Sequence, residues 1–236
     1  MVNWTVDYYS MNCMKAVKTK EQQEIIDKTA AFVQDRLKDA ESGHDWWHIL
    51  RVWNNCKLIL QTEEADPFVC ELTALLHDIA DSKFHGGDES VGPRIAGEFL
   101  TTVGTDQEVI EHVQNIILNM SFKASLGEVK FHSKELEVVQ DADRLDAIGA
   151  IGIARAFNYG GYKNREIYNP EIPFLENQSK EAYKNTTAPT INHFYEKLLL
   201  LKNKMNTDAA KLIAKGRHEY METFLQQFYG EWNGER

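Results

Sequence analysis

Hydrophobic residues recur at intervals of three and four along most of the chain, and this helical period restricts the fold more than any other feature. In the segment 21–40, for example, Ile26, Ala30, Val33 and Leu37 share one face. Proline, which interrupts helices, occurs only five times, and even the irregular segment 162–186 lacks the alternation typical of a strand. The sequence therefore predicts an all-α, bundle-like fold.

Capping signals and breaks in the hydrophobic pattern place the expected helices. Asp45 is a plausible N-cap, Asp66-Pro67 opens the next helix, and Thr105 to Glu108 has the form of a capping box. The segment 162–186 is polar and too long for a simple connection, so we expect a lid or substrate loop there. The expected helices are 21–40, 45–59, 66–78, one around 95–100, 109–120, 133–159, 188–205 and 207–232.

Length and charge favour a single domain that acts on a small molecule. The 236 residues contain no linker, so we expect one domain over 21–236, after a loosely ordered N-terminal extension of residues 1–20. A formal net charge of -10 argues against nucleic acid as the main ligand. Neither a signal peptide nor a membrane span is expected, and the default location is cytoplasmic. Of the three cysteines, Cys56 and Cys70 fall in apolar helical positions and are expected to be buried free thiols, while Cys13 forms no CxxC pair.

Histidines and aspartates occur at three places that together could bind a metal ion. His77-Asp78 ends an apolar run, His48 lies upstream, and Asp141, Asp143 and Asp146 lie downstream. Imidazoles mixed with carboxylates suit a divalent transition ion such as Mn, Fe, Co, Ni or Zn. Such an ion polarises a phosphoryl oxygen and lowers the pKa of a bound water, so the pattern indicates a hydrolase.

Each of these places also has a simpler interpretation. His48 and Arg51 share one stripe of a helix, which is either part of a pocket or a solvated face. His77 and Asp78 diverge by about 100° on a regular helix, so they suit one ion best near a helix end. The aspartates of 141–146 could be satisfied by a metal, by capping groups, or by ion pairs with nearby arginines, Arg144 or Arg155.

The order of these motifs resembles the HD-domain metal-dependent phosphohydrolases. It consists of His48-x-x-Arg51, then His77-Asp78, then Ala142-Asp143-Arg144-Leu145, and the similarity extends over about Gln22 to Trp232. The strings around these residues, such as Leu75-Leu-His-Asp-Ile-Ala-Asp81-Ser-Lys83, are similar to one bacterial branch, the YpgQ/YedJ-type proteins. The resemblance implies a single HD-domain helical bundle with additional C-terminal helices.

The resemblance also implies roles for particular residues. His48, His77, Asp78 and Asp143 would be the four metal ligands. Asp81 matches the acidic position that orients or deprotonates the attacking water, although it is one methylene shorter than Glu, and it could instead orient a ligand histidine. The candidate residues for substrate binding are Arg51, Lys83, His112 and Asp146. His112 is alternatively a ligand of a second metal, but the lack of an adjacent His-His pair favours one ion.

The expected activity is hydrolysis of (deoxy)nucleoside triphosphates to the monophosphate and pyrophosphate, with Mn favoured and Co, Ni, Fe, Zn or Mg as alternatives. This substrate and metal follow from the resemblance, because residue spacing alone does not separate pyrophosphate release from monophosphate hydrolysis. Alternatives are a 5′-nucleotidase or phosphodiesterase of the same family, a di-iron oxygenase, and a non-catalytic nucleotide sensor. The expected partner is a small phosphorylated substrate, and the sequence also allows a homodimer.

Overall fold

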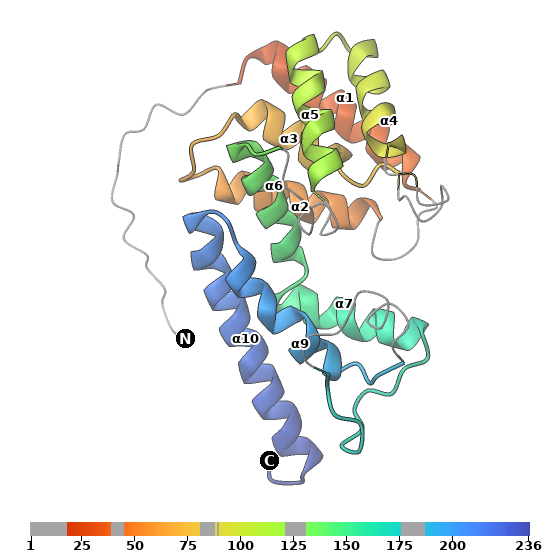
Figure 1. The fold of residues 1–236 in the computed structure, drawn as a ribbon, viewed down its shortest axis with the longest axis vertical. Helices are drawn as coiled ribbons and strands as arrows, with labels where there is room; N and C mark the ends of the chain where they lie inside the picture. Colours follow the sequence, from red (N-terminus) through yellow and green to blue (C-terminus); the bar gives the residue numbers. More distant parts are fainter. Residues whose placement is uncertain (1–17, 39–44, 81–87, 89, 121–130, 176–186) are drawn as a thin grey trace.

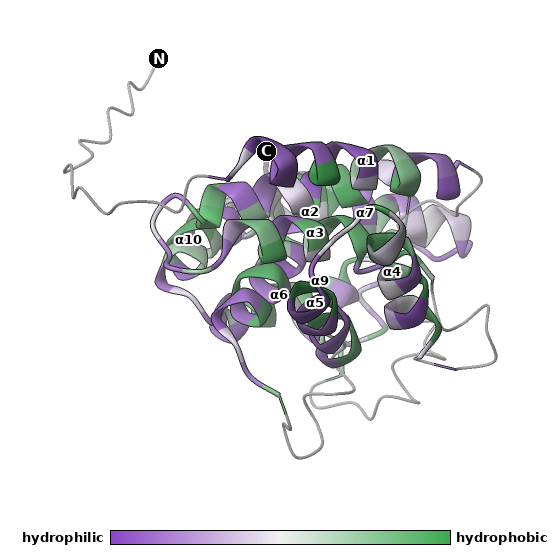
Figure 2. Ribbon diagram, turned by 90° about the horizontal axis from the view of Figure 1, so that it is seen from above, coloured by the Kyte–Doolittle hydropathy of each residue, from purple (hydrophilic) through white to green (hydrophobic). Residues whose placement is uncertain are grey.

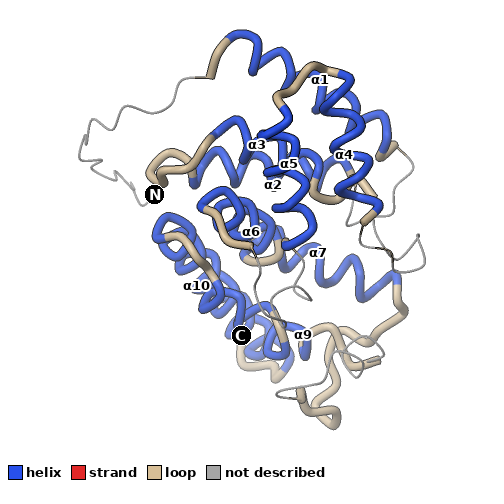
Figure 3. The backbone as a smooth tube through the Cα atoms, turned by 45° about the horizontal axis from the view of Figure 1, so that its top comes forward, coloured by secondary structure: helices blue, strands red, loops and turns tan. Residues whose placement is uncertain are grey.

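The computed structural model describes residues 18–38, 45–80, 88, 90–120, 131–175 and 187–236. Within these ranges all regular secondary structure is helical, as the blue segments of Figure 3 show, and the predicted all-α class is confirmed. The helices are α1 (Lys20–Arg36), α2 (Trp46–Ile59), α3 (Pro67–Leu76), α4 (Val91–Thr102), α5 (Gln107–Asn119), α6 (Lys134–Asp146), α7 (Gly149–Tyr162), α9 (Asn192–Glu196), the 3₁₀ helix η3 (Leu198–Lys204) and α10 (Asp208–Trp232).

Two predicted helix starts are confirmed by their capping hydrogen bonds. The Asp45 side chain accepts a hydrogen bond of 2.9 Å from the backbone N–H of His48 at the start of α2. Asp66 accepts one of 2.8 Å from Phe68, with Pro67 in the first turn of α3. Both caps satisfy N–H groups that have no partner inside the helix.

The expected long helix over 133–159 is in fact two helices. α6 ends at Asp146, and α7 begins at Gly149, whose φ of +76° is incompatible with a continuous right-handed helix. α7 then continues past Gly160 and Gly161 to Tyr162, where the sequence had suggested an earlier end. The hydrophobic period runs across the break because both helices bury one face, so periodicity alone does not reveal it.

Two further sequence predictions are corrected. The expected helix over 188–205 is divided into the short α9 and the 3₁₀ helix η3. The predicted capping box at Thr105 is not formed: α5 begins after Asp106 without a side-chain cap, and the buried Thr105 hydroxyl has no hydrogen-bond partner among the described residues.

The helices form two hydrophobic clusters, and the same three central helices contribute to both. Figure 1 shows α1, α4 and α5 at one end, α7, α9 and α10 at the other, and α6 between them. One cluster joins α1, α4 and α5, the other joins α9, η3 and α10, and each also receives residues from α2, α3 and α6. Figure 2 shows that most helices have a green hydrophobic side and a purple hydrophilic side. The helices α2, α3 and α6 therefore contribute buried residues to both clusters and connect them.

α3 lies in the centre of this arrangement. Every residue from Phe68 to Leu76 is buried, and the helix ends immediately before His77 and Asp78. Cys56 of α2 and Cys70 of α3 are buried free thiols, as expected, and a hydrogen bond between them, together with burial, raises the pKa of Cys70. Cys13 lies outside the described residues, and no helix of the described part is long and apolar enough to cross a bilayer.

Candidate metal centre

His48, His77 and Asp78 come together where α2 meets the end of α3. Each side chain contributes one potential ligand atom, and these atoms all lie within 4.8 Å of one another. Asp78 Oδ2 is 3.8 Å from His48 Nε2 and 3.9 Å from His77 Nε2. One divalent ion can accept such a mixture of imidazole nitrogens and carboxylate oxygens.

The end of α3 explains how two consecutive residues reach the same point. The helix stops at Leu76, so His77 and Asp78 lie in the turn that follows and not on the regular helix. His77 itself still has helical dihedral angles (φ −58°, ψ −32°), and the chain leaves the helix after it. The sequence expectation that this pair lies at a helix C-terminus is confirmed.

His77 has an unsatisfied nitrogen that faces this cluster. Its Nδ1 lies 2.9 Å from the Ala74 carbonyl oxygen, which can only accept, so Nδ1 carries the proton. Its Nε2 is buried and has no hydrogen-bond partner among the described residues. Leaving a buried polar atom without a partner costs about 1–3 kcal/mol. A metal ion next to Nε2 would remove that cost, so the residues present fit a metal.

Asp143 lies beside the cluster on its exposed side. Its Oδ1 is 3.5 Å from His48 Nε2, and its side chain is 45% exposed. It is not part of the group whose ligand atoms all lie within 4.8 Å of one another. Three of the four predicted ligands are therefore brought together, and the fourth adjoins them from α6.

Asp146 lies on the other side of His48 and is almost fully buried. Its Oδ2 is 2.8 Å from His48 Nδ1, and Arg51 donates to both of its oxygens, from Nε at 2.6 Å and from Nη2 at 3.1 Å. Arg155 of α7 also donates to Oδ2. Burial alone would raise the pKa of Asp146, but the hydrogen bonds with His48 and Arg51 and the charge of Arg155 hold it well below the ordinary value of 3.8.

Asp141 has a different environment on the same helix. Its carboxylate accepts hydrogen bonds from the backbone N–H groups of Asn206 and Thr207, from the Thr207 hydroxyl and from Arg144. Burial outweighs these bonds and raises the pKa of Asp141. This aspartate connects α6 to the start of α10, so the ion-pair and capping interpretation applies to Asp141.

The remaining sequence candidates have the following positions. His112 lies apart from the cluster, with its Nε2 3.0 Å from Ser133 Oγ and 3.5 Å from Glu135. Asp81 and Lys83 lie outside the described residues, as do residues 176–186 of the predicted loop 162–186. The sequence offers Arg155 only as an ion-pair partner of the aspartates in 141–146. The structure pairs it with Asp146, across the break between α6 and α7.

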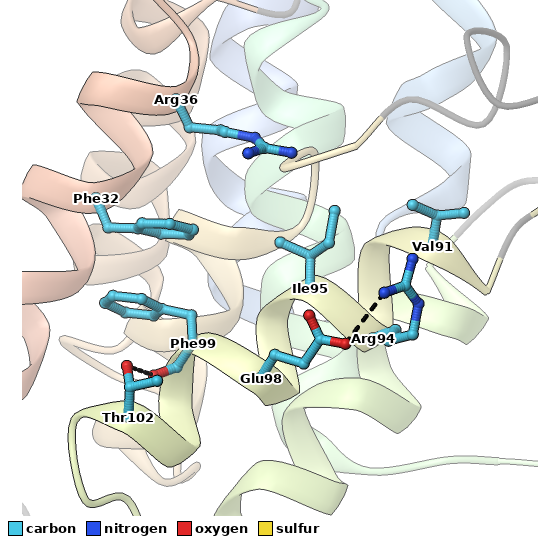
Figure 4. Close-up of a pocket in the computed structure, with 8 residues that line it drawn as sticks. All are labelled: Phe32, Arg36, Val91, Arg94, Ile95, Glu98, Phe99 and Thr102. Atoms are coloured by element: carbon cyan, nitrogen blue, oxygen red, sulfur yellow. Dashed lines mark hydrogen bonds and ion pairs between the residues drawn. The ribbon is translucent and has the colours of Figure 1, made fainter.

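A separate cavity of about 660 Å³ lies between α1 and α4 (Figure 4). Phe32 and Phe99 stack there with ring centroids 4.0 Å apart, and Arg94 pairs with Glu98. None of the candidate ligands lines this cavity. The candidate ligands therefore lie at the His48 cluster and not at this cavity.

Comparisons with known proteins give the family of this chain. The sequence model of the HD domain matches residues 46–148, which include all four predicted ligands. The chain is 38% identical to YpgQ of Bacillus subtilis over 218 residues, covering 91% of this chain and 94% of YpgQ. The crystal structure of an HD-superfamily hydrolase from Bacillus thuringiensis has 44% identity and a TM-score of 0.72, covering 90% of this chain and 98% of that one.

The structure of Bacillus subtilis YpgQ in complex with ADP is also similar, with 35% identity and a TM-score of 0.70 over 89% of this chain and 96% of that chain. The similarity in sequence extends over about nine-tenths of the chain, and the folds match over the same extent. This chain belongs to the HD-domain family of hydrolases.

Proposed function

We propose that this protein is a metal-dependent phosphohydrolase that cleaves (deoxy)nucleoside triphosphates to the monophosphate and pyrophosphate. The observation that carries the proposal is the convergence of His48, His77 and Asp78 beside the half-exposed Asp143. The three clustered residues leave ligand positions for water and substrate, and the exposed side next to Asp143 gives access to them.

Four side chains of this chain would bind the metal ion. The Nε2 atoms of His48 and His77 and the carboxylates of Asp78 and Asp143 would hold the ion, for which Mn is our favoured choice. A divalent ion in this position supplies Lewis-acid polarisation of a phosphoryl oxygen and lowers the pKa of a bound water. Two nitrogens and two carboxylates also suit Fe, Co, Ni or Zn, so the donor set limits the metal without fixing it.

The proposed step is an in-line displacement at the α-phosphorus. The oxygen of a water molecule forms a bond to this phosphorus, the bond to the oxygen that bridges the α- and β-phosphates breaks, and pyrophosphate leaves. The proton of the water passes to the carboxylate of Asp81, which we propose as the general base from the sequence. Asp81 lies outside the described residues, so this role rests on its position four residues after His77.

The local charge favours a phosphorylated substrate even though the whole chain is acidic. Arg51 and Arg155 both pair with Asp146, so this group of three carries one formal positive charge on the Nδ1 side of His48. On the Nε2 side, a bound divalent ion would offset the two carboxylates of Asp78 and Asp143, which leaves the whole site with one positive charge. Both arginine side chains are 31% exposed. Such partly exposed guanidinium groups attract phosphate oxygens by charge and by planar hydrogen-bond geometry.

Support for a nucleotide comes from the relative that binds one. YpgQ of Bacillus subtilis has been crystallised in complex with ADP, and the similarity covers 89% of this chain. By this relationship we propose a nucleotide for the present chain as well. The proposed contacts to its phosphates are Arg51 and Lys83, while His112, which bonds Ser133 away from the cluster, is a weaker candidate.

The decisive experiment separates the products of hydrolysis. Chelator-treated protein would be supplied with Mn, Mg, Co, Ni or Zn and then with nucleoside mono- or triphosphates, with His77→Ala as the blank. Metal-dependent pyrophosphate release from triphosphates is the expected result. Orthophosphate release from monophosphates would replace this proposal with a 5′-nucleotidase. No hydrolysis of any nucleotide by metal-loaded protein would refute the nucleotide substrate.

A further inference from the structure

We propose that Asp146 is a positioning residue that keeps the proton of His48 on Nδ1 and thereby presents the lone pair of Nε2 to the metal position. Arg51 and Arg155 in turn fix Asp146 as an acceptor at both of its oxygens. The inference uses only the metal site of the proposed function and is independent of the substrate.

The first step is the contact between the carboxylate and the imidazole. Asp146 Oδ2 lies 2.8 Å from His48 Nδ1, and the two side chains are 2% and 3% exposed. An ionised carboxylate has only acceptors, so a contact of this length requires a proton on Nδ1. A neutral imidazole has one N–H, so Nε2 then carries the lone pair, and this atom lies 3.8 Å from Asp78 and 3.5 Å from Asp143.

A second neighbour of Nδ1 tests this assignment. Arg155 Nη1 lies 3.3 Å from His48 Nδ1, and a guanidinium group can only donate. If Nδ1 had no proton it could accept from Arg155, but the carboxylate oxygen at 2.8 Å would then face a lone pair and be repelled. The shorter contact is to the charged acceptor, so the geometry favours the proton on Nδ1.

The second step is the restraint on Asp146 itself. Arg51 donates from Nε to Oδ1 and from Nη2 to Oδ2, and Arg155 donates from Nη1 to Oδ2. Because both arginines carry only donors, neither oxygen of Asp146 can become a donor without an unfavourable contact. An amide at this position would therefore place an N–H group against either Arg51 or His48.

In His77 the proton is also held on Nδ1, but by a weaker hydrogen-bond partner. Its Nδ1 donates to the uncharged carbonyl of Ala74, which also leaves Nε2 toward the cluster. A carboxylate partner raises the basicity of a ligand histidine more than a carbonyl does. We therefore expect His48 to depend on its partner more strongly than His77 does.

The test compares two aspartates of the same helix in full-length protein. Asp146→Asn removes the negative charge and one of the two acceptor oxygens that His48 and the arginines share, while Asp141→Asn alters a buried carboxylate that bonds Asn206 and Thr207 instead. In the wild-type protein without metal, two-bond ¹H–¹⁵N NMR spectra of the histidine rings should place the His48 proton on Nδ1. A neutral wild-type ring with its proton on Nε2 and none on Nδ1 would overturn the proposal, whether or not either variant folds.

Metal affinity provides the second readout. Titration with Mn²⁺ should show a dissociation constant about 10–100-fold higher in Asp146→Asn, the usual effect of losing an outer partner of a ligand histidine. Asp141→Asn should melt at a lower temperature than wild type but bind Mn²⁺ with unchanged affinity. Equal affinities for wild type and Asp146→Asn would refute the role of Asp146. Because neither readout uses a nucleotide, failure of the proposed substrate would not affect this result.

Discussion

Gly149 and Arg217 approach so closely that a β-carbon on Gly149 would lie 3.0 Å from both Cβ and Cγ of Arg217. This contact lies at the break between α6 and α7. From α10, Arg217 donates hydrogen bonds to the Leu145 carbonyl and to Asn55 of α2. The glycine therefore allows α10 to reach the end of α6 that carries Asp143 and Asp146.

Replacing Gly149 with alanine should destabilise the protein. Its φ of +76° costs a non-glycine residue about 1–2 kcal/mol, and the new methyl group would also press on Arg217. Urea unfolding should therefore show a lower free energy of unfolding for Gly149→Ala. Gly161→Ala is the matched control on α7, because no atom lies within 4 Å of the added carbon there. Equal stability of the two variants would contradict this explanation of the helix break.

Replacing His77 with alanine should abolish metal retention and leave the fold intact. Its Nε2 has no hydrogen-bond partner among the described residues, so the variant loses the Nδ1 bond to Ala74 and the edge-to-face contact with the His48 ring, whose centroid lies 5.4 Å away. We expect the Mn²⁺ dissociation constant to rise more than about 100-fold, beyond the effect of an outer-shell change. The measurement is a metal titration together with circular dichroism.

His132→Ala is the control for this variant, because His132 is 68% exposed and pairs with Glu137. It should bind metal as the wild type does. Normal turnover in His77→Ala would exclude the candidate metal centre.

Asp81→Asn should lower kcat without weakening the metal site. An amide cannot accept the proton of the attacking water, and loss of a general base costs about 10²–10⁴-fold in rate. Steady-state kinetics at saturating Mn²⁺ and a separate Mn²⁺ titration measure the two effects. If the metal affinity falls as much as kcat, Asp81 acts by orienting a ligand histidine and not as the base.

His193 should make the protein less stable in mild acid. Burial, followed by the positive charges of Lys197 and Arg165, lowers its pKa from 6.5 to about 3. Above pH 6.5 the imidazole is neutral in both the folded and the unfolded state, so it has no effect there. Between pH 6.5 and 3 only the unfolded chain takes up the proton, and the free energy of unfolding falls by up to about 1.4 kcal/mol per pH unit.

The variant His193→Gln, which does not titrate, isolates this effect. The difference in the free energy of unfolding between variant and wild type should be constant above pH 6.5 and shift in favour of the variant below it. Parallel pH profiles of the two proteins would show that His193 is not responsible.

Local signals in the sequence account for much of the fold. Asp45 and Asp66 are caps in the structure because an N-cap depends on hydrogen bonds within one turn. The position of His77-Asp78 at a helix end could also be predicted, since the apolar run of α3 stops there. The break at Gly149 could not be predicted, because the hydrophobic period continues through it and the close approach of Arg217 is a tertiary contact.

The sequence by itself determined the helical class, the family resemblance and the three places that supply His48, His77-Asp78 and Asp143. Residue types and their spacing are local properties, and helical periods and motifs express them directly. Only the tertiary structure separated the three aspartates of α6: Asp141 accepts from Thr207, Asp143 adjoins the metal cluster, and Asp146 supports His48. They lie within six residues of one another, but their partners lie up to 98 positions away. Those partners, and hence the chemistry of each carboxylate, depend on how α2, α6, α7 and α10 pack.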